Sequence, residues 1–427
     1  MTPPIRPLVV ALSLAAAGCG GGGAPAVDPV AGGAADVRAL AKQMETVHPD
    51  LYATVDRDEF RAAVDDVASR ADELEPNELV VELMRLAAMP GVGNGHSGIF
   101  PGDPGHRRTL HLYPIRLYEF PDGTYVVDER EPRGLEGARV VAIDGMSYED
   151  VAEKVRPLVP RDNDSSLRGL LPHYVLTAEV LDGLGIVDGV GPAELTLERA
   201  DGSTEDVTLA PVSAGEYTAA FTDGPHGHYP RSLPSGPGPT YLALSRDRMW
   251  MRTVAGRAVV VGYNSILVPS YDVAVMAERV TARVRRGGIE RVVIDLRLNG
   301  GGNNTTYFPL LQAVQQLPQD RRGRVYVLIG RATFSAAANL AADLDRLTNA
   351  VFVGEPTGGF VRGWGDTMPL VLEATGLQLH VSFRYWDFGM GENDSRLAVE
   401  PDIPVALTAE DFFAGRDPVL QAALSAE

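Results

Sequence analysis

Between residues 291 and 355, hydrophobic positions alternate between short runs and helical repeats. Mainly apolar runs at 292–296, 325–329 and 351–353 predict buried strands. Between these runs, apolar residues recur every three or four positions over 307–317 and 336–344, which predicts two helices. Strands that alternate with helices in this way form a parallel sheet with right-handed crossovers. The pattern therefore predicts an α/β core built around this stretch.

Two chemically suggestive features follow neighbouring strands of the predicted sheet. Glycines 300–302 follow the first strand, and Ser335 lies between the second strand and the next helix. Ligands of open α/β sheets bind at the carboxyl ends of the strands. There, glycine N–H groups and a helix N-terminus stabilise a developing negative charge. The arrangement is typical of a nucleophile beside an oxyanion hole. The alternative is that Ser335 only caps a helix and the glycines only form a tight turn.

The same stretch resembles the C-terminal-processing, or tail-specific, peptidases, which are relatives of the tricorn core protease. The resemblance rests on Asp295–Gly302, Thr333–Ala337, Gly354–Gly359 and Pro401–Val405, which match the family in order and spacing. It implies a crotonase-like (ClpP/crotonase) α/β catalytic core and serine peptidase chemistry, with no metal or organic cofactor. Members of the family often carry a PDZ domain as well.

The general base for Ser335 depends on which basic residues the chain offers. Tail-specific members with a Ser–Lys pair place the lysine just after a Gly-Glu-x-Thr motif, but this chain has no lysine after Lys154. Arg362 lies in that region, and arginine is a poor base because it stays protonated. His96 lies among glycines, where tricorn-like members carry a histidine, and histidine is a common general base. We therefore expect a Ser335–His96 pair, with these histidines as alternatives: His48, His106, His111, His173, His226, His228 and His380.

The remaining site residues complete this expectation. Backbone N–H groups of Gly300, Gly301 and Ala336 are expected to hold the oxyanion. Tricorn-like members also use a serine just before the histidine, where this chain has Gly95, and a later glutamate. Glu392 is the expected acid, with a plain surface charge as the alternative for it. Two other acids lie in the same region, Asp394 and Glu400.

The N-terminus predicts export. Cys19 is the single cysteine of the 427 residues, which excludes internal disulfides and a cysteine metal cluster. The apolar run at 8–17 is too short to span a bilayer, and the segment 16–19 resembles a lipoprotein signal-peptidase site. We expect a signal peptide at 1–18 and a lipid-modified Cys19, which makes the protein an extracytoplasmic lipoprotein of the cell envelope. The alternative is an ordinary secretory signal. The formal charge of −19 disfavours nucleic acid and anionic membrane surfaces as partners.

Composition divides the rest of the chain into segments. A glycine- and alanine-rich flexible tether at 19–35 precedes an N-terminal helical region at 36–90. Residues 91–223 are expected to form a β-rich domain with a helical insertion, and Leu135–Gly145 resembles the core of a PDZ domain. A Pro/Gly linker at 224–240 leads into the catalytic α/β core at 241–427. We expect the β-rich domain either to capture substrate tails by strand addition or to serve as a structural lid.

Together these observations predict a serine endopeptidase of the tail-specific or tricorn type. Its substrate is a peptide or protein, and its membrane contact runs only through the lipid anchor. Two other functions remain as alternatives. One is a non-catalytic peptide-binding lipoprotein on the same fold, which the presence of both Ser335 and His96 argues against. The other is a crotonase-type acyl-CoA enzyme, which the signal sequence disfavours.

Overall fold

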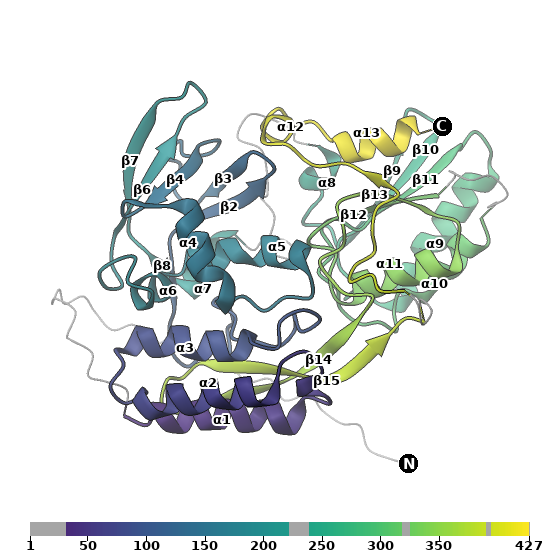
Figure 1. The fold of residues 1–427 in the computed structure, drawn as a ribbon. Coiled ribbons are helices and arrows are strands. Elements are labelled where there is room, and N and C mark those ends of the chain that lie inside the picture. Colours follow the sequence, from purple (N-terminus) through teal and green to yellow (C-terminus); the bar gives the residue numbers. More distant parts are fainter. Residues whose placement is uncertain (1–30, 222–238, 318–324, 390–393, 427) are drawn as a thin grey trace, which may run out of the picture.

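A computed structural model describes residues 31–221, 239–317, 325–389 and 394–426. N-terminal helices lie along one side of the molecule, a β-rich unit stands beside them, and an α/β unit forms the other half (Figure 1). Several expected features fall outside the described residues: the signal peptide, Cys19, most of the tether, nearly all of the linker, His226, His228 and Glu392. Within the described ranges, no helix is both long and apolar enough to cross a membrane.

The α/β unit is built on a six-stranded sheet in the order β16-β13-β12-β11-β10-β9. The predicted strands are confirmed as β11 (Arg291–Asp295), β12 (Val325–Ile329) and β13 (Val351–Gly354), which pair in parallel. Parallel pairing extends to β10 (Ala258–Tyr263) and β16 (Ile403–Pro404), whereas the edge strand β9 (Met249–Val254) is antiparallel. The apolar runs thus reflect strands that are buried on both faces.

Helices cover one face of this sheet. They are α9 (Ser270–Arg285), α10 (Phe308–Gln315) and α11 (Ala336–Leu347), and their apolar sides share a buried cluster with the strands. The two predicted helices correspond to α10 and α11. The opposite face is covered by α8 (Thr240–Ala243), α12 (Ala409–Phe413), α13 (Pro418–Ser425) and the aromatic residues of the β-rich unit, so the two units share one core.

The β-rich unit contains a sheet in the order β2-β3-β4-β6-β7. Its strands are β2 (Ile115–Phe120), β3 (Gly123–Glu129), β4 (Arg139–Ile143), β6 (Ala193–Glu198) and β7 (Thr204–Leu209), and β5 (Met146–Ser147) pairs with β4. The expected helical insertion is present as α4 (Tyr148–Val155), α5 (Asp164–Val175) and α6 (Ala178–Gly183). A two-stranded sheet of β1 (His111–Leu112) and β8 (Val212–Ser213) precedes α7 (Ala214–Phe221).

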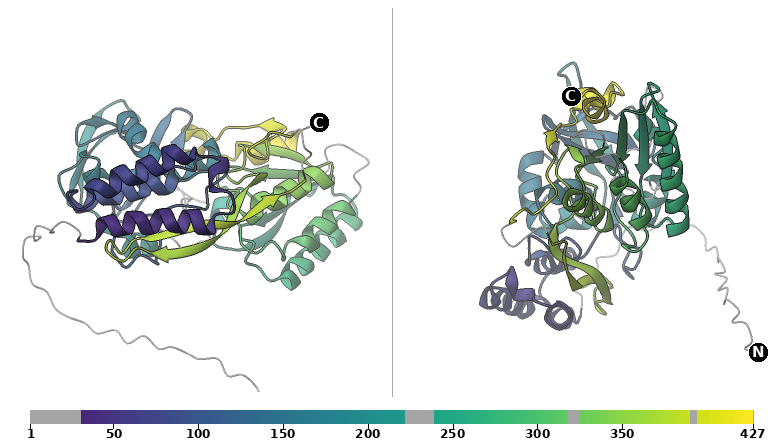
Figure 2. Two further views of the ribbon diagram at one scale, coloured as in Figure 1. Left: turned by 60° about the horizontal axis from the view of Figure 1, so that its bottom comes forward. Right: turned by 90° about the vertical axis from the view of Figure 1, so that its right-hand side faces the viewer.

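A long hairpin joins the α/β unit to the N-terminal helices. These helices are α1 (Gly33–Val47), α2 (Arg57–Arg70) and α3 (Pro76–Ala88). The hairpin of β14 (Arg362–Val371) and β15 (Gln378–Asp387) leaves the α/β unit and runs beside α1, as both views in Figure 2 show. At its tip, the buried carboxylate of Asp36 accepts hydrogen bonds from the N–H groups of Ala374 and Thr375, at 3.1 and 2.7 Å. Residues from opposite ends of the chain therefore form one structure.

Phe120 tests the shared core between the β-rich unit and the core sheet. Its ring is buried and lies 5.5 Å from the ring of Phe412 in α12. We expect Phe120→Ala to lower the free energy of unfolding by about 3–5 kcal/mol in urea titrations, because the cavity cannot be filled from either side. Phe383→Ala, at an exposed position, should change it by no more than about 0.5 kcal/mol. Equal effects of the two substitutions would contradict the shared core.

Candidate active site

Ser335 lies at the turn between β12 and α11 in a conformation unusual for a serine. Its backbone has φ 50° and ψ −129°, and positive φ is costly for a residue with a side chain. Although Ser335 occupies the N-cap position of α11, its side chain makes no capping hydrogen bond. The simple capping role therefore has no support in the structure. Backbone strain of this kind is concentrated at functional sites.

Hydrogen bonds tie the serine turn to the glycine loop after β11. The N–H of Phe334 donates to the carbonyl of Asn299 at 3.0 Å, and the hydroxyl of Thr333 donates to the carbonyl of Leu296 at 2.9 Å. Gly301 has φ 110°, and a Cβ built on it would lie 2.6 Å from the Cβ of Ser335. A side chain at position 301 would thus collide with the serine. Glycine at this position allows the loop backbone to approach the hydroxyl.

The three expected oxyanion donors differ in their surroundings. The N–H of Gly301 donates to Oδ1 of Asn299 at 3.0 Å, so it already has an acceptor. Over the part of the chain that the structure describes, the N–H groups of Gly300 and Ala336 donate no hydrogen bond. Ala336 also stands at the N-terminus of α11, where the helix dipole favours negative charge. Gly300 and Ala336 are consequently better placed than Gly301 to receive an oxyanion.

His96 lies beside the serine turn although 335 − 96 = 239 positions separate it from Ser335. Its ring stacks on the ring of Phe334, the residue before Ser335, with centroids 4.5 Å apart and an interplanar angle of 23°. A second aromatic ring, that of Phe360, lies 5.9 Å away. Burial lowers the pKa of His96 to about 4, so the imidazole is neutral at neutral pH. No hydrogen bond joins the side chains of His96 and Ser335 in the described residues, and their catalytic pairing stays a prediction.

Backbone pairing with the segment before α5 holds the loop that carries His96. The N–H groups of Gly93 and Asn94 donate to the carbonyls of Asp162 and Arg161, at 3.1 and 3.2 Å. The next N–H along the loop, that of Gly95, donates to Oδ1 of Asp162 at 2.6 Å. Asp162 is fully buried, and burial raises its pKa to about 8. Sequence reasoning missed this residue, because Asp162 lies in an ordinary polar run and nothing local marks its burial.

The other described histidines are engaged elsewhere. Nε2 of His48 lies 2.8 Å from Oδ1 of Asn94, and Nδ1 of His111 lies 2.7 Å from Oε1 of Glu179. His380 contacts Asp103, His106 contacts the carbonyl of Phe100, and His173 lies 6.2 Å from the ring of Tyr217. Of the candidate acids, Asp394 pairs with Arg396.

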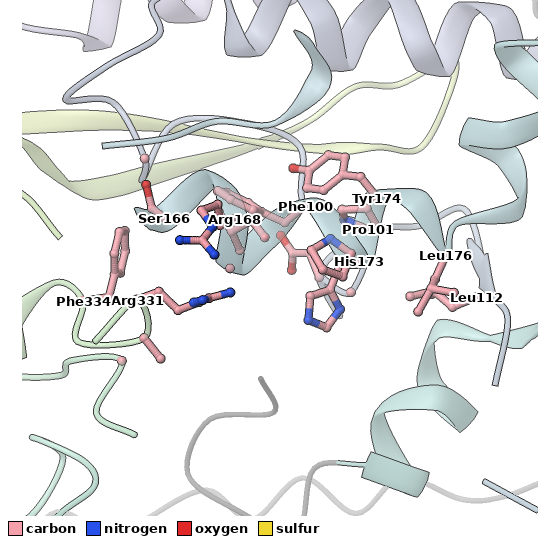
Figure 3. A pocket seen from close by; sticks show the side chains of 18 of the residues that line it. Phe100, Pro101, Leu112, Ser166, Arg168, His173, Tyr174, Leu176, Arg331 and Phe334 are labelled. Carbon is pink, nitrogen blue, oxygen red and sulfur yellow. The ribbon is translucent and has the colours of Figure 1, made fainter. Parts of the chain in front are cut away.

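A cavity of about 560 Å³ opens beside His96 and Phe334. His96, Gly300 and Phe334 line its wall, as do Leu112 and Leu176, and Figure 3 shows Phe334 at the opposite end from the two leucines. Between these ends the lining is mostly apolar, with the guanidinium groups of Arg168 and Arg331 on one side. The cavity therefore offers a peptide-sized space that begins at the histidine and the glycine loop.

The fold of this chain is similar, over most of its length, to that of several solved structures. A crystal structure of a CPAF mutant superposes with a TM-score of 0.65 at 12% identity, covering 93% of this chain and 98% of the other. Mature CPAF gives 0.60 at 13% identity, over 92% and 96%, and mature CPAF complexed with lactacystin gives 0.59 at 12%, over 90% and 96%. At this identity the likeness establishes a shared fold. A comparison with curated proteins finds no match.

The fold and site define a mixed α/β protein with N-terminal helices and a serine at a strand-to-helix turn, which is the arrangement of a serine hydrolase. Residues 305–405 match the model of peptidase family S41, a segment that includes Ser335, α11 and the whole β14–β15 hairpin. This match shows that the segment is similar to the serine peptidases of family S41.

The pKa of His96 leads to a pH dependence of stability. An unfolded histidine has a pKa of about 6.5, whereas burial lowers that of folded His96 to about 4. Between these values the unfolded chain binds a proton that the folded chain does not, so acidification favours unfolding. We expect wild type to lose about 2–3 kcal/mol more stability than His96→Asn between pH 7 and 4.5, measured by urea titration. Parallel stability curves for the two proteins would show that His96 is not buried as described.

Proposed function

We propose that the protein is a serine endopeptidase of the tail-specific or tricorn type, with Ser335 as nucleophile and His96 as general base. The observation that carries the proposal is the stacking of His96 on Phe334 at 4.5 Å, next to the strained Ser335 turn. It brings the histidine of a distant glycine-rich loop to the turn that carries Ser335, beside the glycine loop after β11. The positions of Gly300 and Ala336 add the donors that such chemistry requires.

The reaction follows from these positions. His96 accepts the proton of Ser335 while Oγ attacks the peptide carbonyl and forms the tetrahedral intermediate. The N–H groups of Ala336 and Gly300 stabilise the oxyanion, and that of Gly301 joins them if Asn299 releases it. His96 then gives the proton to the leaving amine as the C–N bond breaks. Water, activated by the same imidazole, hydrolyses the acyl-enzyme. Glu392 remains the proposed acid from the sequence.

The architecture supports a peptide as substrate. The cavity beside His96 runs between the α/β unit and the β-rich unit, so an extended chain placed in it contacts both. We take the α/β unit as a crotonase-like core and the β2–β7 sheet as a PDZ-like domain. In this arrangement the β-rich unit receives part of the substrate while the core cleaves it.

The alternative function is peptide binding without turnover. The absence of a hydrogen bond between His96 and Ser335 among the described contacts favours it, whereas catalytic hydrogen bonds often tighten only when substrate binds. A fluorophosphonate probe separates the two functions, because it reacts covalently only with an activated serine.

Substitution of the pair tests the proposal. Ser335→Ala should abolish probe labelling and casein hydrolysis, and His96→Ala should lower both by about 10³-fold or more, with the double variant no worse than Ser335→Ala. The matched control is Ser147→Ala, because the Ser147 hydroxyl does cap its helix, at 3.1 Å from the N–H of Asp150. That control should lose about 1 kcal/mol of stability and no activity. Full activity in Ser335→Ala would overturn the proposal.

We also propose that the protein is a cell-envelope lipoprotein anchored through Cys19. The support is the segment Ala16–Cys19 after a short apolar run, followed by glycines. Cys19→Ala should move the protein from the membrane fraction to the soluble fraction of cells that express the full chain. Mass spectrometry of the wild-type N-terminal peptide should show an acylated cysteine. An unacylated wild-type protein in the soluble fraction would contradict the anchor.

A further inference from the structure

Asn299 is a fully buried residue at the start of the glycine loop after β11, and its side-chain amide joins two segments. Nδ2 donates to the carbonyl of Tyr263, the last residue of β10, at 2.6 Å. Oδ1 accepts the N–H of Gly301 at 3.0 Å. Because a carbonyl only accepts and an N–H only donates, these two partners fix the orientation of the amide. The side chain thus ties the glycine loop to the neighbouring strand.

The backbone of the same residue ties the loop to the serine turn. The carbonyl of Asn299 accepts the N–H of Phe334, the residue before Ser335, at 3.0 Å. A trans peptide is planar, so the N–H of Gly300 points in the direction opposite to that carbonyl. The hydrogen bond from Phe334 therefore also sets the direction of the Gly300 N–H. Gly300 lines the cavity beside His96.

Asn299 contributes the only side chain of loop residues 299–302, because residues 300–302 are glycine. Glycine has the widest choice of backbone conformation, so these residues do not hold their own geometry. The peptide before Gly300 is held by Phe334, and the peptide after it is held by the amide of Asn299 through the N–H of Gly301. Without the amide, the second of these peptides is able to turn, and the donor at Gly300 moves with it.

We propose that Asn299 is a positioning residue for the oxyanion hole. Its amide holds the glycine loop against β10, so that the N–H of Gly300 stays directed at the place where the oxyanion forms. The inference rests on the proposed function of Ser335 and deepens it by naming the side chain that controls one of the donors. The N–H of Gly301 stays on Asn299 during the reaction, which leaves Gly300 and Ala336 as the two donors. Because Asn299 is fully buried, it acts through the loop and not on the substrate itself.

Asn299→Leu tests the inference, because leucine has a similar size and branching but can neither donate to Tyr263 nor accept from Gly301. Removal of an oxyanion donor typically lowers kcat by about 10²–10³-fold. Since this variant displaces a donor without removing it, we expect kcat for casein hydrolysis and the rate constant for fluorophosphonate labelling of Ser335 to fall by about 10–10²-fold. KM should stay within about two-fold, because the oxyanion forms only in the transition state.

The matched control is Asn264→Leu. Asn264 is also buried, follows Tyr263 directly, and donates through Nδ2 to the carbonyls of Leu244 and Asp247 at 3.1 and 2.9 Å. Its amide thus secures the end of β10 to the segment between α8 and β9. This variant should lose stability as Asn299→Leu does, because both leave buried carbonyls without a donor. It should nevertheless label within about two-fold of wild type.

Asn299→Asp provides a rescue at acidic pH. A protonated carboxyl offers one donor and one acceptor, as the amide does in this structure. Burial at this position raises the pKa of the introduced carboxyl, so it holds its proton at pH 5.5. His96 is still neutral there, because its pKa is about 4. At this pH we expect Asn299→Asp to label within about three-fold of wild type, whereas Asn299→Leu stays slow.

The outcomes separate the inference from the proposed function. A folded Asn299→Leu that labels at the wild-type rate would overturn the inference alone, and so would an equal loss in Asn264→Leu or an Asn299→Asp as slow as Asn299→Leu at pH 5.5. If circular dichroism shows that Asn299→Leu does not fold, Asn299→Ala takes its place with the same expected fall. A wild type that the probe does not label at all would overturn both the inference and the proposed function.

Discussion

The contact between the rings of His96 and Phe334 is the interaction on which the site depends. It joins a loop near the N-terminus to a turn in the C-terminal third, and no local preference of either segment produces it. Three further segments hold the loop in place: the residues before α5, Phe360, and β15, where Gly98 and His380 exchange backbone hydrogen bonds of 3.0 and 2.9 Å. The site therefore exists only when the N-terminal helices, the β-rich unit and the α/β unit have assembled.

The site destabilises the folded chain through backbone strain and through a buried polar atom without a partner. Ser335 adopts a positive φ, Gly301 and Gly302 approach neighbouring backbone closely, and Nδ1 of His96 is buried without a partner. Each of these features destabilises the folded chain on its own. The large apolar clusters on both faces of the core sheet offset this cost. Strain concentrated beside a well-packed sheet is the usual arrangement for an enzyme, because the rigid sheet holds the reactive groups in position.

The electrostatic environment of the groups beside Ser335 differs from that of the cavity wall. Burial keeps the imidazole of His96 uncharged, which suits a general base, and it also keeps a proton on Asp162. Around the cavity, in contrast, Arg331 pairs with Glu355 and Arg168 with Glu119. The cavity wall therefore carries compensated charges, whereas the described residues form no ion pair with His96 or Asp162. A proton can move between such groups without first breaking a strong ion pair.

The sequence by itself determined the alternation of strands and helices in the α/β unit, the glycine loop and the serine at the turn. These features are local, since a buried parallel strand is a run of apolar residues and a tight turn needs glycine. The sequence also limited the base to histidine or a carboxylate, because no lysine follows Lys154. Only the tertiary structure brought His96 rather than another described histidine to the serine turn. It alone revealed Asp162, whose chemistry depends on burial, and burial is decided by packing between segments far apart in the chain.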